Sequence, residues 1–338
     1  MSEFDFVDSY AAQREVGSTL PANEATSALN CGFVGIGGGG GKLAKAFVDL
    51  GFSKTILVNT TAKDFEAGVG EEHLLALPEL DGVAKDIEAG KNALSTNSTL
   101  IEDSLRTRLG AVDWLFVLAC GGGGTGSAVG ALDDTFRRYL SSVEADGKVV
   151  YVVTKPTAQE LLNPTIAENY ASLLRDVSEK SYILLDNERQ LNRLRGQVGV
   201  TQLYPSANAM FAKMLAMVLF LAAESSPIAA FDSKDLSRFL SCPGRIVLGS
   251  VRAEADQNLG ATLFQGCVNA SPCPKPEGRS AVGAMLVIIS EQMAENPEVS
   301  GHLEAASAYV GGRCDTLFAG TYVRPDVELV GLLALGGL

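Results

Sequence analysis

The sequence predicts an α/β protein in which a Rossmann-like domain on a parallel sheet is followed by a long central helix and a smaller α+β domain. Three observations lead to this fold class. Continuously apolar strand segments alternate with helical segments through the first half of the chain, as in parallel sheets covered on both faces. Two glycine-rich runs each follow such a strand. A long apolar helical segment then separates this half from a region with a different pattern.

The first domain is predicted to contain five strands, each a short apolar run. They lie at 31–36, 54–59, 113–119, 148–154 and 181–185. Apolar residues at helical spacing predict helices at 42–50 and 128–140, and a helix-rich stretch with loops fills the chain up to about residue 109.

The second half begins with a helix at 205–224 that is apolar nearly all round, which is typical of a central core helix. Strands are predicted beyond it at 245–252, 281–290, 316–323 and 327–335, and helices at 256–268 and near 303–309. The last two strands are joined by a short Arg-Pro turn, which suggests a mixed domain. We therefore expect a flexible arm at 1–30, a first domain at 31–203, a core helix at 204–226 and an α+β domain at 227–338.

The chain is acidic, with 27 Lys and Arg against 40 Asp and Glu and a net charge of −13 over 338 residues. Such a surface repels nucleic acid and anionic membranes, so neither is an expected partner. A local anion site made from backbone N–H groups is still compatible with it.

Compartment signals favour the cytoplasm. Residues 1–30 lack the apolar run of a signal peptide, and the longest apolar stretch, 209–223, is interrupted by Lys213 and reads as a buried helix, too short to span a bilayer. The six cysteines are scattered without a CxxC pair, and the chain has two histidines. This argues against a zinc site or a disulfide framework and predicts reduced thiols, several of them buried.

The first glycine run, Gly35–Gly40, fits G-x-G-x-x-G between a strand and a helix. Glycines there let backbone amides approach phosphate oxygens. An NAD site would also place an acidic residue at the end of the second strand, where Asn59 stands. A Walker A loop would need other residues at Ile36 and Leu43.

The second glycine run, CGGGGTGS at 120–127, also lies between a predicted strand and a predicted helix. Two such turns in one sheet can hold one polyphosphate from two sides. The alternative is that the glycines only make tight turns.

At this point the sequence resembles the tubulin/FtsZ superfamily of GTPases. GGGTGS at 122–127 looks like its signature loop, and the run at 35–41 looks like its first nucleotide loop. The resemblance extends over roughly 31–336. It implies binding of GTP and GDP with Mg²⁺ in the first domain, and head-to-tail assembly of copies of this chain into cytoskeletal filaments.

Several segments carry the resemblance further. NTTA at 59–62 resembles the second loop, GVAKDIEAG at 82–90 the loop that senses the γ-phosphate, TKP at 154–156 the start of the fifth loop, and LDNE at 185–188 the guanine-reading segment. The resemblance implies these nucleotide-binding residues: Gly37, Gly38, Gly39, Gly40, Gly41, Lys42, Asn59, Thr60, Gly121, Gly122, Gly123, Gly124, Thr125, Gly126, Ser127, Pro156, Glu160, Asn187, Tyr204 and Asn208.

Tyr204 and Asn208 also make chemical sense as a pair. Residues four apart lie on one helix face, where a ring can stack on a base and an amide can read its edge as donor and acceptor. By resemblance, Glu160 contacts the ribose. The alternative is that Tyr204 is a core aromatic residue and Asn208 a helix cap.

FDSKDL at 231–236 resembles the synergy loop, which in this superfamily enters the nucleotide site of the next subunit. The resemblance implies that Asp235 orients the attacking water and Asp232 assists, so that hydrolysis requires polymerisation. The same residues also read as a helix N-cap resembling a capping box, and both roles can hold together.

Several positions depart from the FtsZ pattern. Thr61 replaces an aspartate near the metal, Lys42 an asparagine, Ala128 a glycine and Ala230 an asparagine, while Pro164 lies near the place of an arginine. These departures, and the lack beyond 336 of FtsZ's linker and C-terminal peptide or of tubulin's helices, favour a divergent prokaryotic member, of a kind carried by phages or plasmids.

Three functions follow as hypotheses. The first is a filament-forming GTPase that is active at the subunit interface. The second is a filament protein that binds GTP but hydrolyses it weakly or not at all. The third is an NAD-binding Rossmann oxidoreductase, opposed by Asn59 and by the second glycine run. An adaptor or cargo is left open.

Overall fold

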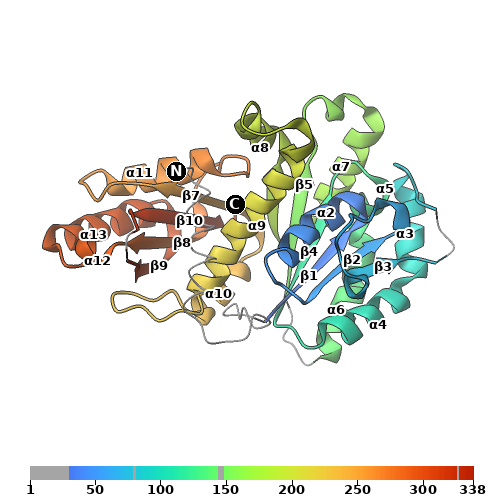
Figure 1. Cartoon of the computed structure of the whole chain (residues 1–338), viewed down its shortest axis with the longest axis horizontal. Helices are drawn as coiled ribbons and strands as arrows, with labels where there is room; N and C mark the ends of the chain where they lie inside the picture. Colours follow the sequence, from blue (N-terminus) through green and yellow to red (C-terminus); the bar gives the residue numbers. More distant parts are fainter. Residues whose placement is uncertain (1–29, 79–80, 144–147, 326) are drawn as a thin grey trace. The chain divides into compact units, whose positions relative to one another are not determined.

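The computed structural model describes residues 30–78, 81–143, 148–325 and 327–338 (Figure 1). It divides into two compact units, an N-terminal unit, Leu29–Ala212, and a C-terminal unit that contains Lys213–Leu338. The predicted arm at 1–30, apart from its last residue, lies outside the described residues.

The N-terminal unit is built on a parallel sheet. Its strands, in spatial order, are β3 (Leu74–Ala76), β2 (Thr55–Asn59), β1 (Cys31–Ile36), β4 (Trp114–Cys120), β5 (Lys148–Lys155) and β6 (Ser181–Asp186). The five predicted strands are confirmed to within a residue or two at their ends. The three-residue β3 was not predicted, because so short a strand shows no readable pattern.

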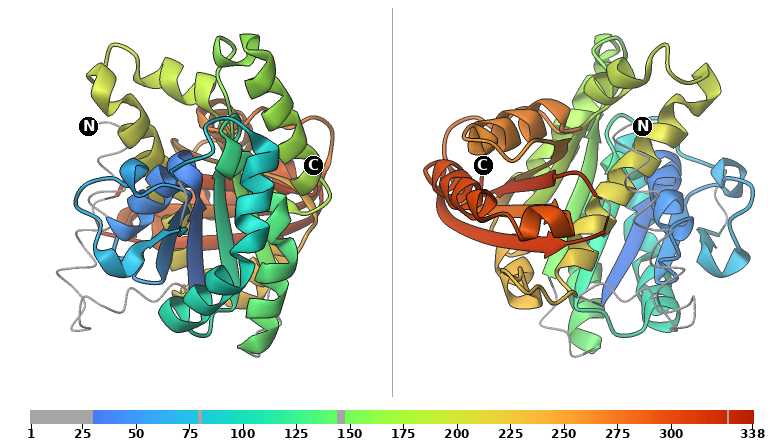
Figure 2. Two further views of the ribbon diagram at one scale, coloured as in Figure 1. Left: turned by 90° about the vertical axis from the view of Figure 1, so that its right-hand side faces the viewer. Right: turned by 60° about the vertical axis from the view of Figure 1, so that its left-hand side comes forward.

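Helices cover both faces of this sheet, as predicted. Phe33 of β1 stacks on Phe47 of helix α2 (Gly37–Val48), with ring centroids 4.2 Å apart. The next residue, Val34, points to the other face and belongs to a core that includes Leu105 and Phe136. Figure 2 (left) shows the blue α2 on one side of these strands and cyan-to-green helices on the other.

The remaining helices of this unit differ in part from the prediction. They are α3 (Ile87–Thr96), α4 (Ser98–Leu109), α5 (Gly124–Ser127), α6 (Asp133–Ser142), α7 (Pro164–Val177) and α8 (Asn187–Leu194). The helix predicted at 128–140 is interrupted by a 3₁₀ turn at Val129–Leu132. At Gly130 a Cβ atom would lie 2.4 Å from Asp176 Oδ2, so α7 leaves no room for a side chain there. Likewise α2 begins at Gly37 rather than at residue 42, because the glycine run itself forms its first turn.

The C-terminal unit contains a mixed sheet of four strands. Their order is β7 (Gly244–Arg252), β10 (Val330–Gly336), β8 (Ser280–Ile289) and β9 (Cys314–Val323). β10 is antiparallel to β7 and β8, whereas β8 and β9 are parallel. The two strands nearest the end of the chain are therefore not partners, because β8 lies between them. The helices are α10 (Ser233–Leu240), α11 (Leu259–Ala270), α12 (Glu291–Ala294) and α13 (Pro297–Gly311).

The predicted long helix is α9 (Leu203–Leu221), which begins in the N-terminal unit and continues in the C-terminal unit. Within the described residues, the helical segment Val200–Leu221 is long and apolar enough to cross a membrane, judged by length and composition alone. The apolar stretch 209–223 is by itself too short, and the helix extends further toward the N-terminus than that stretch does. Half of its apolar window is buried in the structure, and the core helix of a globular protein meets the same criteria.

Four of the six cysteines are buried: Cys31, Cys267, Cys273 and Cys314. The prediction that several thiols are buried is confirmed.

Candidate nucleotide-binding site

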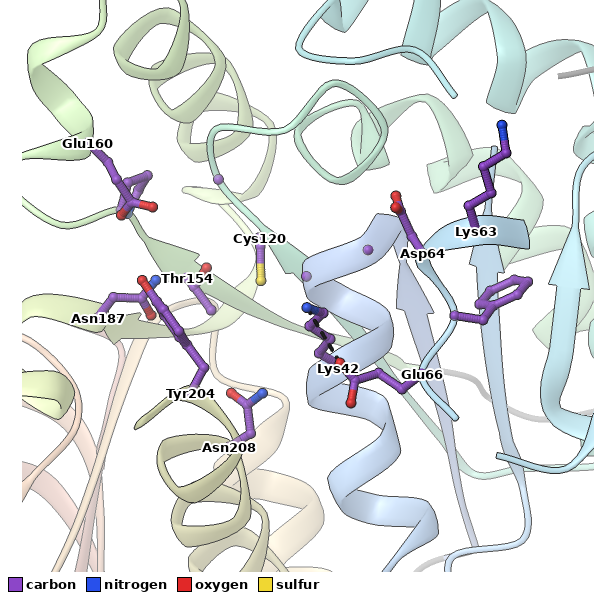
Figure 3. Close-up of a pocket in the computed structure, with 15 residues that line it drawn as sticks. Lys42, Lys63, Asp64, Glu66, Cys120, Thr154, Glu160, Asn187, Tyr204 and Asn208 are labelled. Carbon is purple, nitrogen blue, oxygen red and sulfur yellow. Dashed lines mark ion pairs between the residues drawn. The ribbon is translucent and has the colours of Figure 1, made fainter. Parts of the chain in front are cut away.

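A cavity of about 620 Å³ opens at the carboxyl ends of the parallel strands of the N-terminal unit (Figure 3). Its walls come from the residues that follow β1, β2, β4, β5 and β6, and from the first turns of α9. Ligands of open parallel sheets bind at this edge, and the volume suits a small molecule. An adjoining cavity of about 270 Å³ shares Gly38, Gly39, Asp64 and Cys120 with it.

The first glycine loop forms the start of α2. Gly37 has φ +74°, which favours glycine, and the residue before it, Ile36, provides no side-chain cap. The first N–H groups of α2 are therefore free to meet an anion. Gly40 packs so closely on β4 that a Cβ atom would lie 2.3 Å from the carbonyl oxygen of Leu118.

The second glycine loop is shaped by its own hydrogen bonds. Gly122 has φ +108°, and its N–H donates to Ser127 Oγ at 3.0 Å. The Asn169 amide donates to the carbonyl of Gly122 at 3.3 Å. The N–H of Gly124 donates to the carbonyl of Ala84 at 3.1 Å, which joins the signature loop to the third loop.

Four loops meet around the smaller cavity. It is lined by both glycine loops, by Asn59 and Thr60 after β2, and by Gly82, Val83 and Ala84. The hydroxyls of Thr60 and Thr125 are 2.9 Å apart and hydrogen-bonded. This dense set of glycine amides and hydroxyls suits the oxygens of a phosphate chain.

The other end of the larger cavity carries side chains suited to a base and a sugar. Tyr204, Asn208, Asn187 and Glu160 point into it (Figure 3). Tyr204 is 41% exposed, so it is not a core aromatic residue, and burial, together with Glu160, raises its pKa. Asn208 lies inside α9, which begins five residues earlier, so it does not cap that helix. The two alternative roles considered for this pair are therefore wrong.

Glu160 is held in place locally. Its Oε2 accepts hydrogen bonds from the N–H of Thr157 at 2.7 Å and from the Thr157 hydroxyl at 2.8 Å. Asn187 is the first residue of α8, whose N-cap is Asp186. The Asp186 carboxylate pairs with Lys155 at 3.0 Å, which fixes the junction between β6 and α8.

The two cavities bring together most of the predicted nucleotide residues. The residues that line one or both cavities are Gly37, Gly38, Gly39, Lys42, Asn59, Thr60, Gly121, Gly123, Gly124, Thr125, Gly126, Pro156, Glu160, Asn187, Tyr204 and Asn208. Four predicted residues line neither: Gly40, Gly41, Gly122 and Ser127. Gly40 is a packing residue against β4, Gly41 packs on Leu57, and the other two set the shape of the second loop.

The sequence did not reveal several lining residues. Lys63, Asp64, Phe65 and Glu66 all line the larger cavity, although they follow β2 without any recognisable motif. Glu66 pairs with Lys42 of α2 at 3.4 Å, so an ion pair borders the cavity (Figure 3). The only feature of the sequence that could have pointed to this segment is its charges, Lys63, Asp64 and Glu66, which directly follow NTTA at 59–62.

Cys120 and Thr154 also line the cavity unpredicted. Burial raises the pKa of the Cys120 thiol to about 11, against a smaller opposing effect of the Thr154 hydroxyl beside it. Thr154 Oγ1 is buried, and the neighbouring Cys120 thiol is only a weak hydrogen-bond donor and acceptor.

Asp232 and Asp235 belong to the C-terminal unit and line neither cavity. Asp232 is the N-cap of α10: its Oδ1 accepts from the N–H groups of Lys234 at 2.8 Å and Asp235 at 3.0 Å. These bonds, that of Asp235 first, lower the pKa of the Asp232 carboxyl. The capping role considered for this segment is confirmed. Among the described residues, no three His, Cys, Asp or Glu side chains are grouped to hold a metal ion by themselves.

No family model matches the chain. Among curated proteins it is similar to the tubulin-like protein TubZ of Bacillus cereus and of Bacillus anthracis, with 22% identity over 258 residues. The match includes 70% of this chain and 58% of TubZ, so the chain spans less than two thirds of the length of these relatives.

Solved structures show the same fold. A GTPγS-bound protofilament of CetZ2 from Haloferax volcanii matches with a TM-score of 0.74 and 22% identity over 91% of this chain and 92% of that one. A helical model of the two-stranded TubZ-Bt filament matches with a TM-score of 0.77 and 18% identity over 94% and 86%. FtsZ of M. jannaschii matches with a TM-score of 0.69 and 17% identity over 91% of each chain.

The predicted fold class and the predicted resemblance are thus both confirmed. The long helix, the glycine loops at the strand ends and the mixed second sheet form one tubulin-like fold that extends over nine tenths of the chain. This chain therefore has the fold of the CetZ, TubZ and FtsZ proteins that it matches.

Proposed function

We propose that this protein is a cytoplasmic GTP-binding protein that polymerises head to tail and hydrolyses GTP where one subunit meets the next. The observation that carries the proposal is the pair of adjoining cavities in the N-terminal unit, which together offer two chemically different ends. One end is lined by glycine-loop amides and the other by Tyr204, Asn208 and Asn187. This order of groups matches a nucleoside triphosphate laid along the strand ends.

Binding follows from the chemistry of each end. The free N–H groups at the start of α2, with its positive dipole end, attract phosphate oxygens. The partly exposed ring of Tyr204 offers a face for a purine, and Asn208 offers both a donor and an acceptor to its edge. Glu160, fixed by Thr157, accepts a hydrogen bond from a ribose hydroxyl.

Assembly is supported by apolar side chains beside the cavity. Leu162 is 81% exposed and Val200 is 85% exposed, the two highest values among the exposed large hydrophobic residues described. Leu162 follows cavity residue Glu160 by two positions, and Val200 precedes cavity residue Tyr204 by four. A second copy seated here would bury both side chains. Contacts between unlike faces that do not close into a ring give open filaments, as the related protofilaments are.

Hydrolysis is assigned to the acidic pair of the C-terminal unit, acting on the nucleotide of the neighbouring subunit. Asp235 orients the attacking water and Asp232 assists. The cap uses Oδ1 of Asp232, and Oδ2 takes no part in it. Mg²⁺, when bound, neutralises developing charge on the β- and γ-phosphates.

A weakly hydrolysing filament protein is the second candidate. The observation that favours it is that Asp232 serves as a helix cap, while Thr61 stands where FtsZ has a carboxylate. This candidate predicts filaments that persist with unreleased nucleotide. Collapse of the filaments as GTP runs out would contradict it.

A thermal-shift comparison tests the ligand class. GTP and GTPγS should raise the melting temperature in a concentration-dependent way, because a ligand that binds the folded state stabilises it. ATP and NADH at the same concentrations and ionic strength should leave it nearly unchanged. Stabilisation by NADH and not by GTP would restore the oxidoreductase hypothesis.

A further inference from the structure

Asp64 places a carboxylate between the two cavities of the candidate site. It lines both of them and ends a short 3₁₀ turn, Ala62–Asp64, that follows β2. Its Oδ2 lies 3.4 Å from Asn59 Nδ2, and a Cβ atom built on Gly38 would lie 3.3 Å from the same oxygen. Asp64 therefore faces the glycine loop that the proposed function assigns to phosphate (Figure 3).

The turn that positions Asp64 depends on Thr61. The Thr61 hydroxyl accepts from the N–H of Lys63 at 3.2 Å and caps the turn. Thr61 is 9% exposed and packs near Gly82. The residue that lacks the carboxylate of FtsZ thus initiates the turn that carries another carboxylate, three residues later, to the cavity.

The charges around Asp64 leave it without a cation. The lysines that line the larger cavity have other carboxylate partners: Lys42 pairs with Glu66 at 3.4 Å and Lys63 with Asp81 at 2.7 Å. Within the described parts of the chain Asp64 forms no ion pair. A carboxylate beside a polyphosphate is repelled unless a cation lies between them.

Other oxygen-bearing side chains of a kind that binds hard divalent cations line the smaller cavity together with Asp64. Asn59 Oδ1 accepts from the N–H of Thr60 at 2.8 Å, and the hydroxyls of Thr60 and Thr125 are bonded to each other beside the smaller cavity. Mg²⁺ is usually held in proteins by one or two carboxylates together with substrate phosphates and waters, not by a cage of protein ligands. The lack of a three-residue acidic cluster among the described residues is consistent with such a site.

We infer that Asp64 is the protein's carboxylate ligand, direct or through a bound water, for the divalent cation that accompanies the nucleotide phosphates. The inference rests on the proposed function, because the phosphates supply most of the ligands. If Asp64 holds the cation, then the strengthening of nucleotide binding by Mg²⁺ depends on the Asp64 carboxylate.

The test measures the dissociation constant of fluorescently labelled GTPγS with Mg²⁺ and with EDTA. Protein is kept dilute so that assembly does not contribute, and ionic strength is held constant with a sodium salt. In the unmodified chain Mg²⁺ should strengthen binding. In Asp64→Asn this enhancement should fall by about tenfold or more, while the affinity in EDTA should be unchanged or slightly higher, because a negative charge beside the phosphates is removed.

Asp81→Asn is the matched control. It removes the same charge from an exposed side chain that pairs with Lys63 and lines neither cavity, so it should keep the full Mg²⁺ enhancement. An Asp64→Asn protein with the full enhancement overturns the inference and leaves the proposed function standing. No binding of GTPγS by the unmodified chain under either condition overturns the proposed function and this inference together. An affinity of Asp64→Asn in EDTA at least as high as that of the unmodified chain shows that the variant is folded.

Discussion

The Asp232 carboxylate accepts a hydrogen bond from the backbone N–H of Asp235 at 3.0 Å. The start of α10 therefore holds the Asp232 carboxylate in place and sets Asp235 in the first turn of the same helix. A structural cap and a catalytic pair are compatible in the one segment that contains Asp232 and Asp235, and substitutions can separate the two roles.

Asp235→Ala should lower assembly-dependent GTP turnover by about 100-fold or more and leave the affinity for GTPγS unchanged, because Asp235 does not line the cavity of its own chain. Phosphate release and nucleotide binding are measured on the same preparation. Unchanged turnover would remove Asp235 from the mechanism.

Asp232→Asn and Asp232→Ala distinguish capping from catalysis. Asparagine caps a helix about as well as aspartate, whereas alanine costs about 1 kcal/mol. Only the alanine variant should therefore lose stability in urea, while both should lose turnover if the carboxylate assists the water. Full turnover in Asp232→Asn would show that the residue is a cap and nothing more.

Tyr204→Leu should weaken GTP binding by about 5- to 150-fold, the range that stacking free energies of about 1–3 kcal/mol per base imply. Tyr204→Phe keeps the ring and should bind nearly as well as the unmodified chain. Equal affinities for the leucine and phenylalanine variants, measured by fluorescence titration, would mean that the base does not stack on this ring.

Gly39→Ala tests the close approach of the first glycine loop to β4. A Cβ atom there would lie 2.7 Å from both Cβ and Sγ of Cys120, so the free energy of unfolding should fall by about 1–3 kcal/mol. Gly41→Ala is the control: its nearest neighbour would be Leu57 at 3.6 Å, and the variant should gain about 0.5–1 kcal/mol.

The double variant Gly39→Ala, Cys120→Gly completes this test. It should lose less stability than the sum of the two single variants, because the second change makes room for the first. Additive losses in urea titrations would show that the strain lies elsewhere.

Leu162→Ser should raise the critical concentration for assembly by roughly tenfold, because one large apolar side chain is lost from each contact. The affinity for GTPγS should not change, since Leu162 does not line the cavity. Leu100→Ser on α4 is the control, as Leu100 is also exposed but follows no cavity residue. The critical concentration is measured by light scattering across a series of protein concentrations. An equal effect of both substitutions would exclude a specific interface at Leu162.

The sequence predicted the strands of the sheet well because each is a continuous apolar run bounded by glycine or polar residues. It predicted both glycine loops because their glycines stand out in the sequence, and the positive φ of Gly37 and Gly122 strongly favours glycine. It could not show that α2 starts inside the first loop, or that a 3₁₀ turn at Val129–Leu132 interrupts the next helix. The packing of Gly130 against Asp176 comes from a distant segment of the chain.

The segment 63–66 shows the same limit at the site. Its charges match no motif, and the turn capped by Thr61 places Asp64 at the glycine loop, while Glu66 pairs with Lys42. From the sequence, Thr61 looked like the loss of a carboxylate. In the structure the acidic group is present three residues later.

The central claim is that a subunit contact completes the GTPase site. The most direct test is phosphate release per molecule of protein, measured with Mg²⁺ and saturating GTP across a series of protein concentrations. A site that is completed between subunits should give negligible release below a threshold concentration and a sharp rise above it, in step with light scattering. A specific activity that is independent of protein concentration would contradict this claim, because each chain would then hydrolyse GTP alone.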